Sequence, residues 1–402
     1  MKTVFADPQF SFELLRTLGH AYYSGSDIAE CLHTADRIKE GDNESWYSEW
    51  NKTAELVHGQ AEESLAKGHR VSAREAYLRA SNYYRTAEFF LHDNPSDPRI
   101  MELWQESHEA FTRAAELFDP PFEFIEIPYE GTTLPGCLFK ADGTKKQRPT
   151  MLLHTGFDGT LEELYFEGAA AAVRRGYNCL AFEGPGQGRV LRQQKLYFRH
   201  DWEKVVTPVV NYALTRPEID GRRLVLMGIS FGGYLAPRAV AFEHRIATCI
   251  ANSGLFDFFS IFVPPGMERQ GSLDYIVSNP ADTDKMMDEM AKSNSTMRWS
   301  LADGKWKFDS GSPSGYARKA AQYTLDGVAD KITCRMLVID AEGEQFFPGQ
   351  AKKLYDILTC PKDMIIFTEA EAAGEHCQVG AHSRGHQRIF DWLDEFFAGM
   401  DK

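Results

Sequence analysis

The stretch LVLMGISFG, residues 224–232, decides the fold of this 402-residue chain. Its first four residues are an apolar run typical of a buried strand, and residues 234–242 have the pattern of a helix. Gly228 and Gly232 flank Ser230 because a sharp strand-to-helix turn leaves no room for a Cβ on either side. Such a turn lifts the serine hydroxyl above a sheet, at the positive end of a helix. The pattern predicts that Ser230 is a nucleophile, and a tight turn without chemistry is the alternative that the motif alone leaves open.

Short apolar runs that alternate with helical patterns continue on both sides of this motif. They lie at residues 122–127, 134–139, 150–154, 178–182, 223–227, 248–251, 336–340 and 364–367. The first two read as an antiparallel pair, and the others as strands of a parallel sheet with helices on both faces. Residues 257–331 depart from this rhythm and contain helical patterns around 273–277, 282–293 and 315–325. We therefore expect an α/β fold with a helical cap inserted before the last two strands.

The chain before residue 120 has a different pattern. Apolar residues recur at helical spacing in the segments 14–32, 45–66, 71–91 and 98–117. The pattern changes at Asp119, Pro120 and Pro121. We therefore predict an N-terminal helical domain over residues 1–119 and a catalytic domain over residues 120–402, with the cap-like insertion at about 257–331.

The overall composition disfavours several classes of partner. The formal net charge is -14 and no basic stripe occurs, so nucleic acid and anionic membranes are poor candidates. The seven cysteines are spread out without metal-binding spacing, which is typical of reduced thiols in an intracellular protein. No stretch approaches the ~18 apolar residues of a membrane span, and the N-terminus lacks the pattern of a signal peptide. We expect a cytoplasmic enzyme, and the sequence leaves a homodimer open.

A nucleophilic serine needs a base, and the base needs an acid that orients it. Where the serine lies at such a turn, the order along the chain is serine, then acid, then histidine. The loop that follows the run 336–340 offers three carboxylates: Asp340, Glu342 and Glu344. Glu344 is the preferred acid because it lies a few residues beyond the strand, before Pro348 closes the loop. Asp340 is the second candidate and Glu342 the third.

The base is expected in the loop after the last apolar run. His376 lies there, in the segment GEHCQ at 374–378, just before the closing helix. A lone histidine is more often structural than catalytic, but the order of the motifs favours His376 as the general base. His382 and His386 are the alternatives, within or beside the closing helix.

The oxyanion hole is expected from the loop HTGFDG at 154–159, which follows the first central parallel strand. Its donors are backbone N–H groups, so we predict the amides of Phe157 and Phe231, the latter being the residue after the nucleophile. His154 is expected to steady this loop rather than to take part in chemistry.

The segment EGPGQG at 183–188 superficially resembles a phosphate-binding loop. It lacks the Gly-Lys-Ser/Thr of a P-loop and the spacing of a dinucleotide-binding fingerprint. We expect a structural turn there. Since no metal-ligand motif occurs either, the sequence predicts no cofactor and no metal.

These segments together resemble the α/β-hydrolases related to dihydroxypseudooxynicotine hydrolase. The resemblance rests on residues 154–159, 182–188, 228–233, 340–348 and 374–378. The same group includes the yellowish-green-type fungal hydrolases that shorten polyketide chains. Its members often carry Asp at the acid position, where this chain has Glu344. The resemblance implies the α/β-hydrolase fold, a mostly parallel sheet with helices on both faces, and also fits an N-terminal helical domain.

The resemblance also implies the chemistry, which is hydrolysis of a carbon–carbon bond next to a carbonyl in an aromatic or polyketide-like substrate. The residues themselves indicate only a serine hydrolase. An esterase, thioesterase or cyclase that releases or closes a polyketide is the first alternative. A non-catalytic binding protein on the same fold is the second, and the presence of Ser230, Glu344 and His376 disfavours it.

Overall fold

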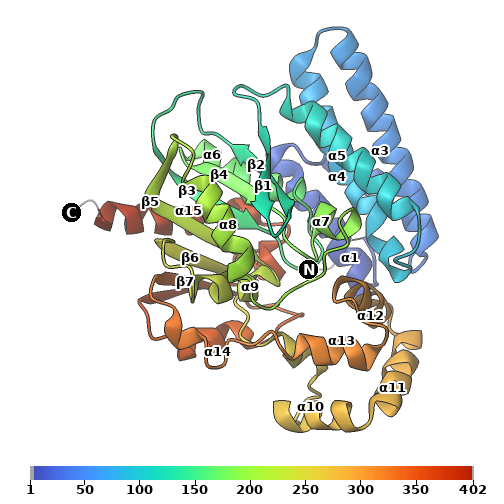
Figure 1. The fold of residues 1–402 in the computed structure, drawn as a ribbon. Coiled ribbons are helices and arrows are strands. Elements are labelled where there is room, and N and C mark those ends of the chain that lie inside the picture. Colours follow the sequence, from blue (N-terminus) through green and yellow to red (C-terminus); the bar gives the residue numbers. More distant parts are fainter. Residues whose placement is uncertain (1–3, 401–402) are drawn as a thin grey trace. The chain divides into compact units, whose positions relative to one another are not determined.

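The computed structural model describes residues 4–400 and divides them into two compact units. The first unit holds the chain up to Glu123 together with residues 289–303 and 379–383, and the second holds the other described residues. Figure 1 labels the helices and strands of both. The first unit takes in two segments from later in the chain. The division into domains at residue 120 therefore remains our proposal.

Helices make up the N-terminal part of the first unit. They are α1 (Pro8–Gly19), α2 (Ile28–Ala35), α3 (Asn43–Ala66), α4 (Arg70–Glu88) and α5 (Arg99–Ala115), with the 3-10 turns η1 (His20–Tyr23) and η2 (Phe89–Asp93). The carboxylates of Asp7, Asp27 and Asp42 cap α1, α2 and α3 by accepting N–H groups of the first turn. The sequence pattern at 14–32 predicted one helix, but two are present. Ser24 adopts a left-handed φ of 64° after η1, and Asp27 then starts a new helix.

Aromatic rings fill the core of this helical part. The Trp46 ring lies 5.0 Å from the ring of Phe10 and 5.0 Å from that of Phe90. Its indole N–H donates to the Thr86 carbonyl at 2.8 Å, so the buried polar atom is satisfied. The aromatic residues of the N-terminal helices therefore form a packed core. Within residues 4–400, no helix combines the length and the apolar character needed to cross a membrane.

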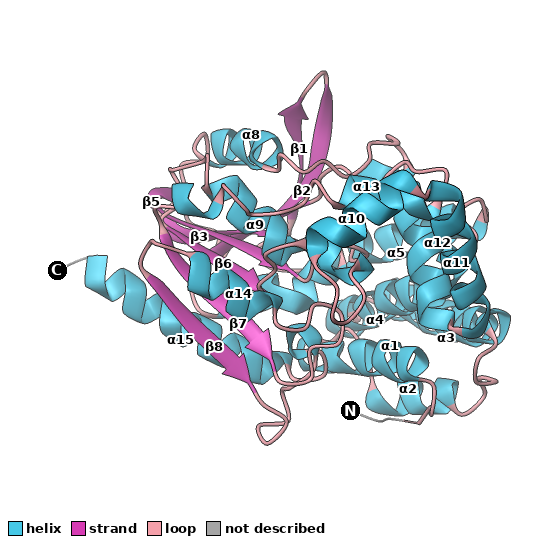
Figure 2. Ribbon diagram, turned by 90° about the horizontal axis from the view of Figure 1, so that it is seen from below, coloured by secondary structure: helices cyan, strands magenta, loops and turns pink. Residues whose placement is uncertain are grey.

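In the described chain, eight strands form one sheet in the order β1-β2-β4-β3-β5-β6-β7-β8 (Figure 2). Their bounds are β1 (Glu123–Tyr129), β2 (Thr132–Phe139), β3 (Arg148–His154), β4 (Asn178–Phe182), β5 (Ile219–Ile229), β6 (Thr248–Asn252), β7 (Arg335–Ala341) and β8 (Lys362–Phe367). Strand β2 pairs antiparallel with β4, and all pairs from β4 to β8 are parallel. Each predicted apolar run forms a strand. The residues of β4 are all buried, as a strand covered on both faces requires.

Helices that follow the strands pack back onto the sheet. They are α6 (Ala170–Arg174), α7 (Gly188–Arg192), α8 (Glu203–Ala213), α9 (Gly232–Val240), α14 (Gln350–Ile357) and α15 (His382–Met400). Helix α9 contacts β5 and β6, α14 contacts β7 and β8, and α6 contacts β4. The chain therefore crosses repeatedly from strand to helix, as the alternating pattern predicted.

The segment between β6 and β7 is helical. It contains η4 (Phe258–Phe262), α10 (Arg269–Ser278), α11 (Pro280–Ser293), α12 (Ser295–Lys307) and α13 (Pro313–Ala320). The sequence pattern located α10, α11 and α13 but missed α12. Neither α10 nor α12 has a single apolar face. The short run LDYIV at 273–277 marks α10, whereas the apolar residues of α12, STMRWSLADGKWK, are scattered.

Candidate active site

Ser230 lies at the sharp turn between β5 and α9. Its φ is 61°, in the left-handed region that residues other than glycine rarely adopt. The Ser230 N–H donates to the carbonyl of Asn252 at 2.5 Å, and the Ser230 carbonyl accepts from the Gly233 N–H at 2.7 Å. A Cβ on Gly228 would collide with the Gly232 carbonyl, so glycine is needed there. The turn has the geometry that the motif predicted.

A second glycine packs directly on this turn from the loop after β3. A Cβ on Gly156 would lie 2.5 Å from both the Ile229 carbonyl oxygen and the Phe231 nitrogen, and 2.9 Å from the Ser230 Cβ. The absence of a side chain at residue 156 therefore lets the loop approach the serine and keeps space beside the Phe231 amide.

The three residues predicted as nucleophile, base and acid lie together in the second unit. The His376 Nε2 atom lies 2.9 Å from Ser230 Oγ, and its Nδ1 atom lies 2.6 Å from Glu344 Oε2. His376 is 5% exposed, so water competes little for these hydrogen bonds. Their catalytic roles remain predictions, but the arrangement is that of a serine, a base and an orienting acid.

The competing carboxylates and histidines have other partners. Asp340 accepts the N–H of Ala341 at 2.9 Å, and Glu342 accepts the N–H of Glu369 at 2.8 Å. His386 contacts the carbonyl oxygen of Glu167 at 2.8 Å, and the His382 ring stacks on that of His20 with centroids 5.4 Å apart. Geometry therefore favours Glu344 and His376 over these alternatives.

Glu344 is held by several donors. Its Oε1 atom accepts the N–H groups of Phe346 and Phe347 at 2.9 and 3.1 Å, and its Oε2 atom accepts the Ser253 hydroxyl at 2.8 Å as well as His376. Burial raises the pKa of Glu344, but His376 and these donors outweigh it and lower the pKa to about 2. Burial lowers the pKa of His376, whereas Cys377 and Glu344 raise it above its ordinary value. An ionised Glu344 must accept Nδ1–H, and this leaves Nε2 facing the Ser230 hydroxyl.

The sequence did not single out Asn252 and Ser253, which tie the three residues together. Asn252 is paired with Ile229 across β5 and β6, so its carbonyl lies beside the turn and holds the Ser230 N–H. Ser253 follows directly and donates to Glu344. The sequence could have indicated both residues, because they are polar and follow a strand next to that of the nucleophile. Neighbouring parallel strands end at the same edge of a sheet.

The loop at 154–159 is held in place by Gln187. The Gln187 side chain donates to the carbonyls of Thr155 and Gly156 at 2.7 and 3.1 Å, and accepts the N–H of Gly184 at 2.9 Å. Phe157 follows in this loop, and Phe231 directly follows Ser230 at the start of α9. Their role as oxyanion donors stays a prediction.

His154 is buried at the end of β3. Its Nδ1 atom lies 2.9 Å from the Thr155 carbonyl oxygen, which can only accept. Burial lowers the pKa of His154 to about 4 despite this bond, so the ring is neutral near pH 7 and fixes the start of the loop. This geometry fits the structural role expected for His154.

The side chain of Glu183 accounts for the need for glycine in the segment 183–188. Its carboxylate accepts the N–H groups of Leu161 and Arg189, each at 2.7 Å, and a Cβ on Gly188 would overlap it. Burial and the neighbouring Glu162 raise the pKa of Glu183 to about 7. The loop thus surrounds a carboxyl group that belongs to the chain itself.

Aromatic rings surround the predicted nucleophile within the second unit. We call the following residues the aromatic layer: Phe157, Phe198, Phe231, Phe258, Phe308, Tyr316, Tyr323 and Phe347. The Phe231 ring lies 4.3 Å from that of Phe258, and the Phe347 ring lies 5.9 Å from the His376 ring. Phe231 is fully buried and Phe258 is 3% exposed. Apolar rings therefore pack against both the residue after Ser230 and the imidazole of His376.

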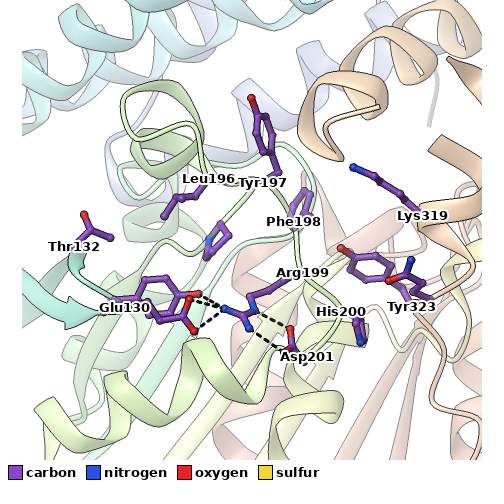
Figure 3. Close-up of a pocket in the computed structure, with 13 residues that line it drawn as sticks. Glu130, Thr132, Leu196, Tyr197, Phe198, Arg199, His200, Asp201, Lys319 and Tyr323 are labelled. Carbon is purple, nitrogen blue, oxygen red and sulfur yellow. Dashed lines mark hydrogen bonds and ion pairs between the residues drawn. The ribbon is translucent and has the colours of Figure 1, made fainter. Parts of the chain in front are cut away.

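A cavity of about 420 Å³ adjoins this layer, with Phe198 and Tyr323 belonging to both (Figure 3). Arg199 lies along its wall and donates to Asp201 at 2.7 Å, to the Tyr129 hydroxyl at 2.7 Å and to Glu130 at 2.9 Å. The guanidinium thereby joins the β1–β2 turn to the segment that precedes α8. Because two carboxylates balance its charge, Arg199 offers little attraction to an anionic ligand.

Comparison with known proteins supports this architecture. Residues 151–391 match the family described as "Alpha/beta hydrolase family". Hydrolase LUC6 of Fusarium sp is 36% identical over 423 residues, which cover 99% of this chain and 98% of LUC6. The 20-hydroxy-prefusarin hydrolase FUS2 of Gibberella moniliformis is 39% identical over 415 residues, which cover 99% of each chain.

A solved structure extends the likeness to the whole fold. The crystal structure of the 2,6-dihydroxy-pseudo-oxynicotine hydrolase superposes with a TM-score of 0.73 over 93% of this chain and 94% of that chain, at 21% identity. At that identity the likeness concerns the fold alone. The α/β-hydrolase fold and the resemblance predicted from sequence are confirmed, and the chain belongs to the Alpha/beta hydrolase family of enzymes and is a hydrolase.

Proposed function

We propose that this hydrolase works through a catalytic triad of Ser230, His376 and Glu344. The observation that carries the proposal is the continuous chain of contacts from Glu344 Oε2 to His376 Nδ1 and from His376 Nε2 to Ser230 Oγ, at 2.6 and 2.9 Å. In the neutral imidazole, an ionised acid on Nδ1 favours the tautomer that carries its proton on Nδ1, so the lone pair of Nε2 faces the serine hydroxyl. A binding protein without catalysis has no need of this arrangement.

In the proposed reaction, Ser230 Oγ attacks the carbonyl carbon of the substrate while His376 Nε2 takes its proton. The amides of Phe157 and Phe231 stabilise the oxyanion of the tetrahedral intermediate, and loss of one such donor typically costs ~10²–10³-fold in kcat. The intermediate collapses, the leaving group takes the proton from the imidazolium, and an acyl-enzyme remains. Water then attacks the acyl group with His376 as base, which releases a carboxylic acid and restores Ser230.

For the substrate we propose an aromatic or polyketide-like ketone that is cleaved at the carbon–carbon bond next to its carbonyl. The aromatic layer supports this choice, because flat conjugated ligands fit apolar surroundings with few polar groups. The relative FUS2, which is 39% identical over nearly the whole chain, is named for one compound, 20-hydroxy-prefusarin. This name also supports the proposal that the present hydrolase acts on a substrate of defined chemistry. Apolar surroundings would keep water away from the carbon leaving group until His376 protonates it.

Esterase, thioesterase and cyclase activities share the same acyl-enzyme, so they differ from the proposal only in the bond that is broken or the group that attacks. The test is product analysis by mass spectrometry in ¹⁸O-labelled water, with a panel of polyketides, diketones, aryl ketones and matched esters. We expect two fragments from a ketone, with label in the new carboxylate and a new C–H bond in the other fragment. Ser230→Ala serves as the control.

Cleavage of esters alone across this panel would replace carbon–carbon hydrolysis by esterase activity and leave the triad in place. Ring closure without label would indicate a cyclase. Turnover by Ser230→Ala at the wild-type rate would refute the proposed triad itself.

A further inference from the structure

The turn that carries His376 has an unusual backbone. Cys377 and Gln378 have φ values of 53° and 56°, so two successive residues other than glycine lie in the left-handed region. Such conformations persist only where the surroundings fix them, and they are concentrated at functional sites.

Gln378 anchors the turn. Its side chain is 2% exposed and donates to Asn252 Oδ1 at 3.2 Å, while its N–H donates to the Glu375 carbonyl at 2.9 Å. Asn252 is the residue whose carbonyl holds the Ser230 N–H. The same asparagine therefore fixes both the serine turn and the histidine turn.

The left-handed backbone brings the Cys377 thiol back towards the imidazole. Cys377 Sγ lies 3.3 Å from His376 Nε2 and 3.4 Å from the Asn252 carbonyl oxygen. A carbonyl oxygen can only accept, so the thiol hydrogen is directed to Asn252 and the sulfur lone pairs face Nε2. The residue is 7% exposed, which shields this contact from water. The nitrogen that faces Ser230 Oγ thus has a second, soft acceptor beside it.

We propose that Cys377 is a positioning residue, whose sulfur accepts a hydrogen bond from Nε2–H while His376 is an imidazolium. The inference rests on the proposed function, since Cys377 acts through His376 as the base. The proton moves from Ser230 Oγ to Nε2 and then to the leaving group, and no bond to sulfur forms or breaks. The thiol holds the protonated ring in place between these two transfers. This matters most for a carbon leaving group, which takes up a proton slowly.

The other groups around the ring are consistent with this role. Glu344 faces Nδ1 from the loop after β7, and Ser230 faces Nε2 from the serine turn. The rings of Phe346 and Phe347 lie against the imidazole with centroids 4.8 and 5.9 Å away and carry no charge. Asp340, at the end of β7, is near enough to Glu344 for its own pKa to be raised by burial and by that carboxylate.

Burial lowers the pKa of His376, while the hydrogen bond to the Cys377 sulfur and the Glu344 carboxylate raise it above its ordinary value. Removing the sulfur while leaving Glu344 in place should therefore lower the pKa of the base. The acidic limb of the pH profile should move to lower pH, because the base stays unprotonated further into the acid range.

The test measures kcat and KM against pH with 4-nitrophenyl butyrate for the full-length wild type, Cys377→Ala and Cys377→Ser. Cys360→Ala is the matched control, because Cys360 is another buried thiol, 9% exposed, near the start of β8. For Cys377→Ala we expect kcat to fall about five-fold, as for one weak hydrogen bond, with KM unchanged and the acidic limb at lower pH. Cys377→Ser should restore the limb, and Cys360→Ala should match wild type.

An unchanged acidic limb in Cys377→Ala would overturn the proposal, whether or not kcat falls, because a packing defect alone does not move it. If Cys377→Ala does not fold, ¹⁵N NMR follows the titration of His376 in two proteins, Ser230→Ala and the double variant Ser230→Ala, Cys377→Ser. These titrations are compared with the pH profile of Cys377→Ser. A His376 pKa at or below its ordinary value with Cys377 present would contradict the role. Full activity of Ser230→Ala would overturn the proposed function instead, so the two failures are distinguishable.

Discussion

The serine turn and the histidine turn solve the same backbone problem in different ways. Ser230 at φ 61° and Cys377 at φ 53° both lie in the left-handed region. The serine turn is fixed by backbone packed on backbone, with Gly156 and Gly228 removing side chains that would collide. The histidine turn is fixed by side chains, chiefly Gln378 on Asn252. The first arrangement depends on glycines that flank or pack on the serine, whereas the left-handed residues of the second, Cys377 and Gln378, both carry side chains.

The largest expected effect tests the chemistry that both turns serve. Ser230→Ala should lower kcat by ~10⁴-fold or more while the melting temperature stays within a few degrees of wild type, because only a hydroxyl is removed. A fluorophosphonate probe should label wild type and not the variant. Equal labelling of both proteins would show that the serine turn does not carry the nucleophile.

The next largest effect is expected from the acid that orients the imidazole ring of His376. Glu344→Gln should lower kcat by roughly 10³–10⁴-fold, since an amide can donate to Nδ1 and favour the wrong tautomer. Asp340→Asn and Glu342→Gln are matched controls from the same loop and should change kcat far less. A larger loss in Asp340→Asn, at equal stability, would transfer the role of the acid to Asp340.

A smaller effect is expected from the backbone contact that distinguishes the serine turn. In Gly156→Ala the new Cβ must displace the Ile229 carbonyl or the Phe231 amide. We expect kcat to fall by about 10²-fold, as for a displacement of ~1 Å at a catalytic group. Gly143→Ala is the control, because a Cβ there meets nothing within 4 Å. Similar kinetics in both variants would mean that the turn relaxes freely.

The smallest effect concerns stability and pH. The pKa of Glu344 is about 2, below its ordinary value of 4.5, so its ionised form stabilises the fold above pH 4.5 and this contribution is lost as the pH falls towards 2. Wild type should exceed Glu344→Gln in free energy of unfolding by on the order of 1–3 kcal/mol above pH 4.5. The difference should shrink between pH 4.5 and 2, measured by urea unfolding. A difference that is independent of pH would show that Glu344 stabilises by packing alone.

This contrast also explains how far the sequence could predict the structure. All eight strands correspond to apolar runs in the sequence, and the serine turn has a glycine on each side of Ser230. The strands and the serine turn were therefore predictable. Helix α12 was missed because it has neither an apolar face nor a short apolar run such as that of α10. Asn252, Ser253 and Cys377 acquire their importance only from the pairing of β5 with β6 and from the left-handed turn. The contacts involved join residues up to 126 positions apart. Patterns within a short window cannot report such contacts.

Glu183 has a consequence for the choice of assay conditions. The glycine-rich loop at 183–188 already encloses a carboxylate that accepts the N–H groups of Leu161 and Arg189. Inorganic phosphate would have to displace a covalently attached carboxyl group to bind there. Rates measured in phosphate buffer should therefore equal those in a zwitterionic buffer of the same pH and ionic strength, and inhibition by phosphate would have to arise elsewhere in the molecule.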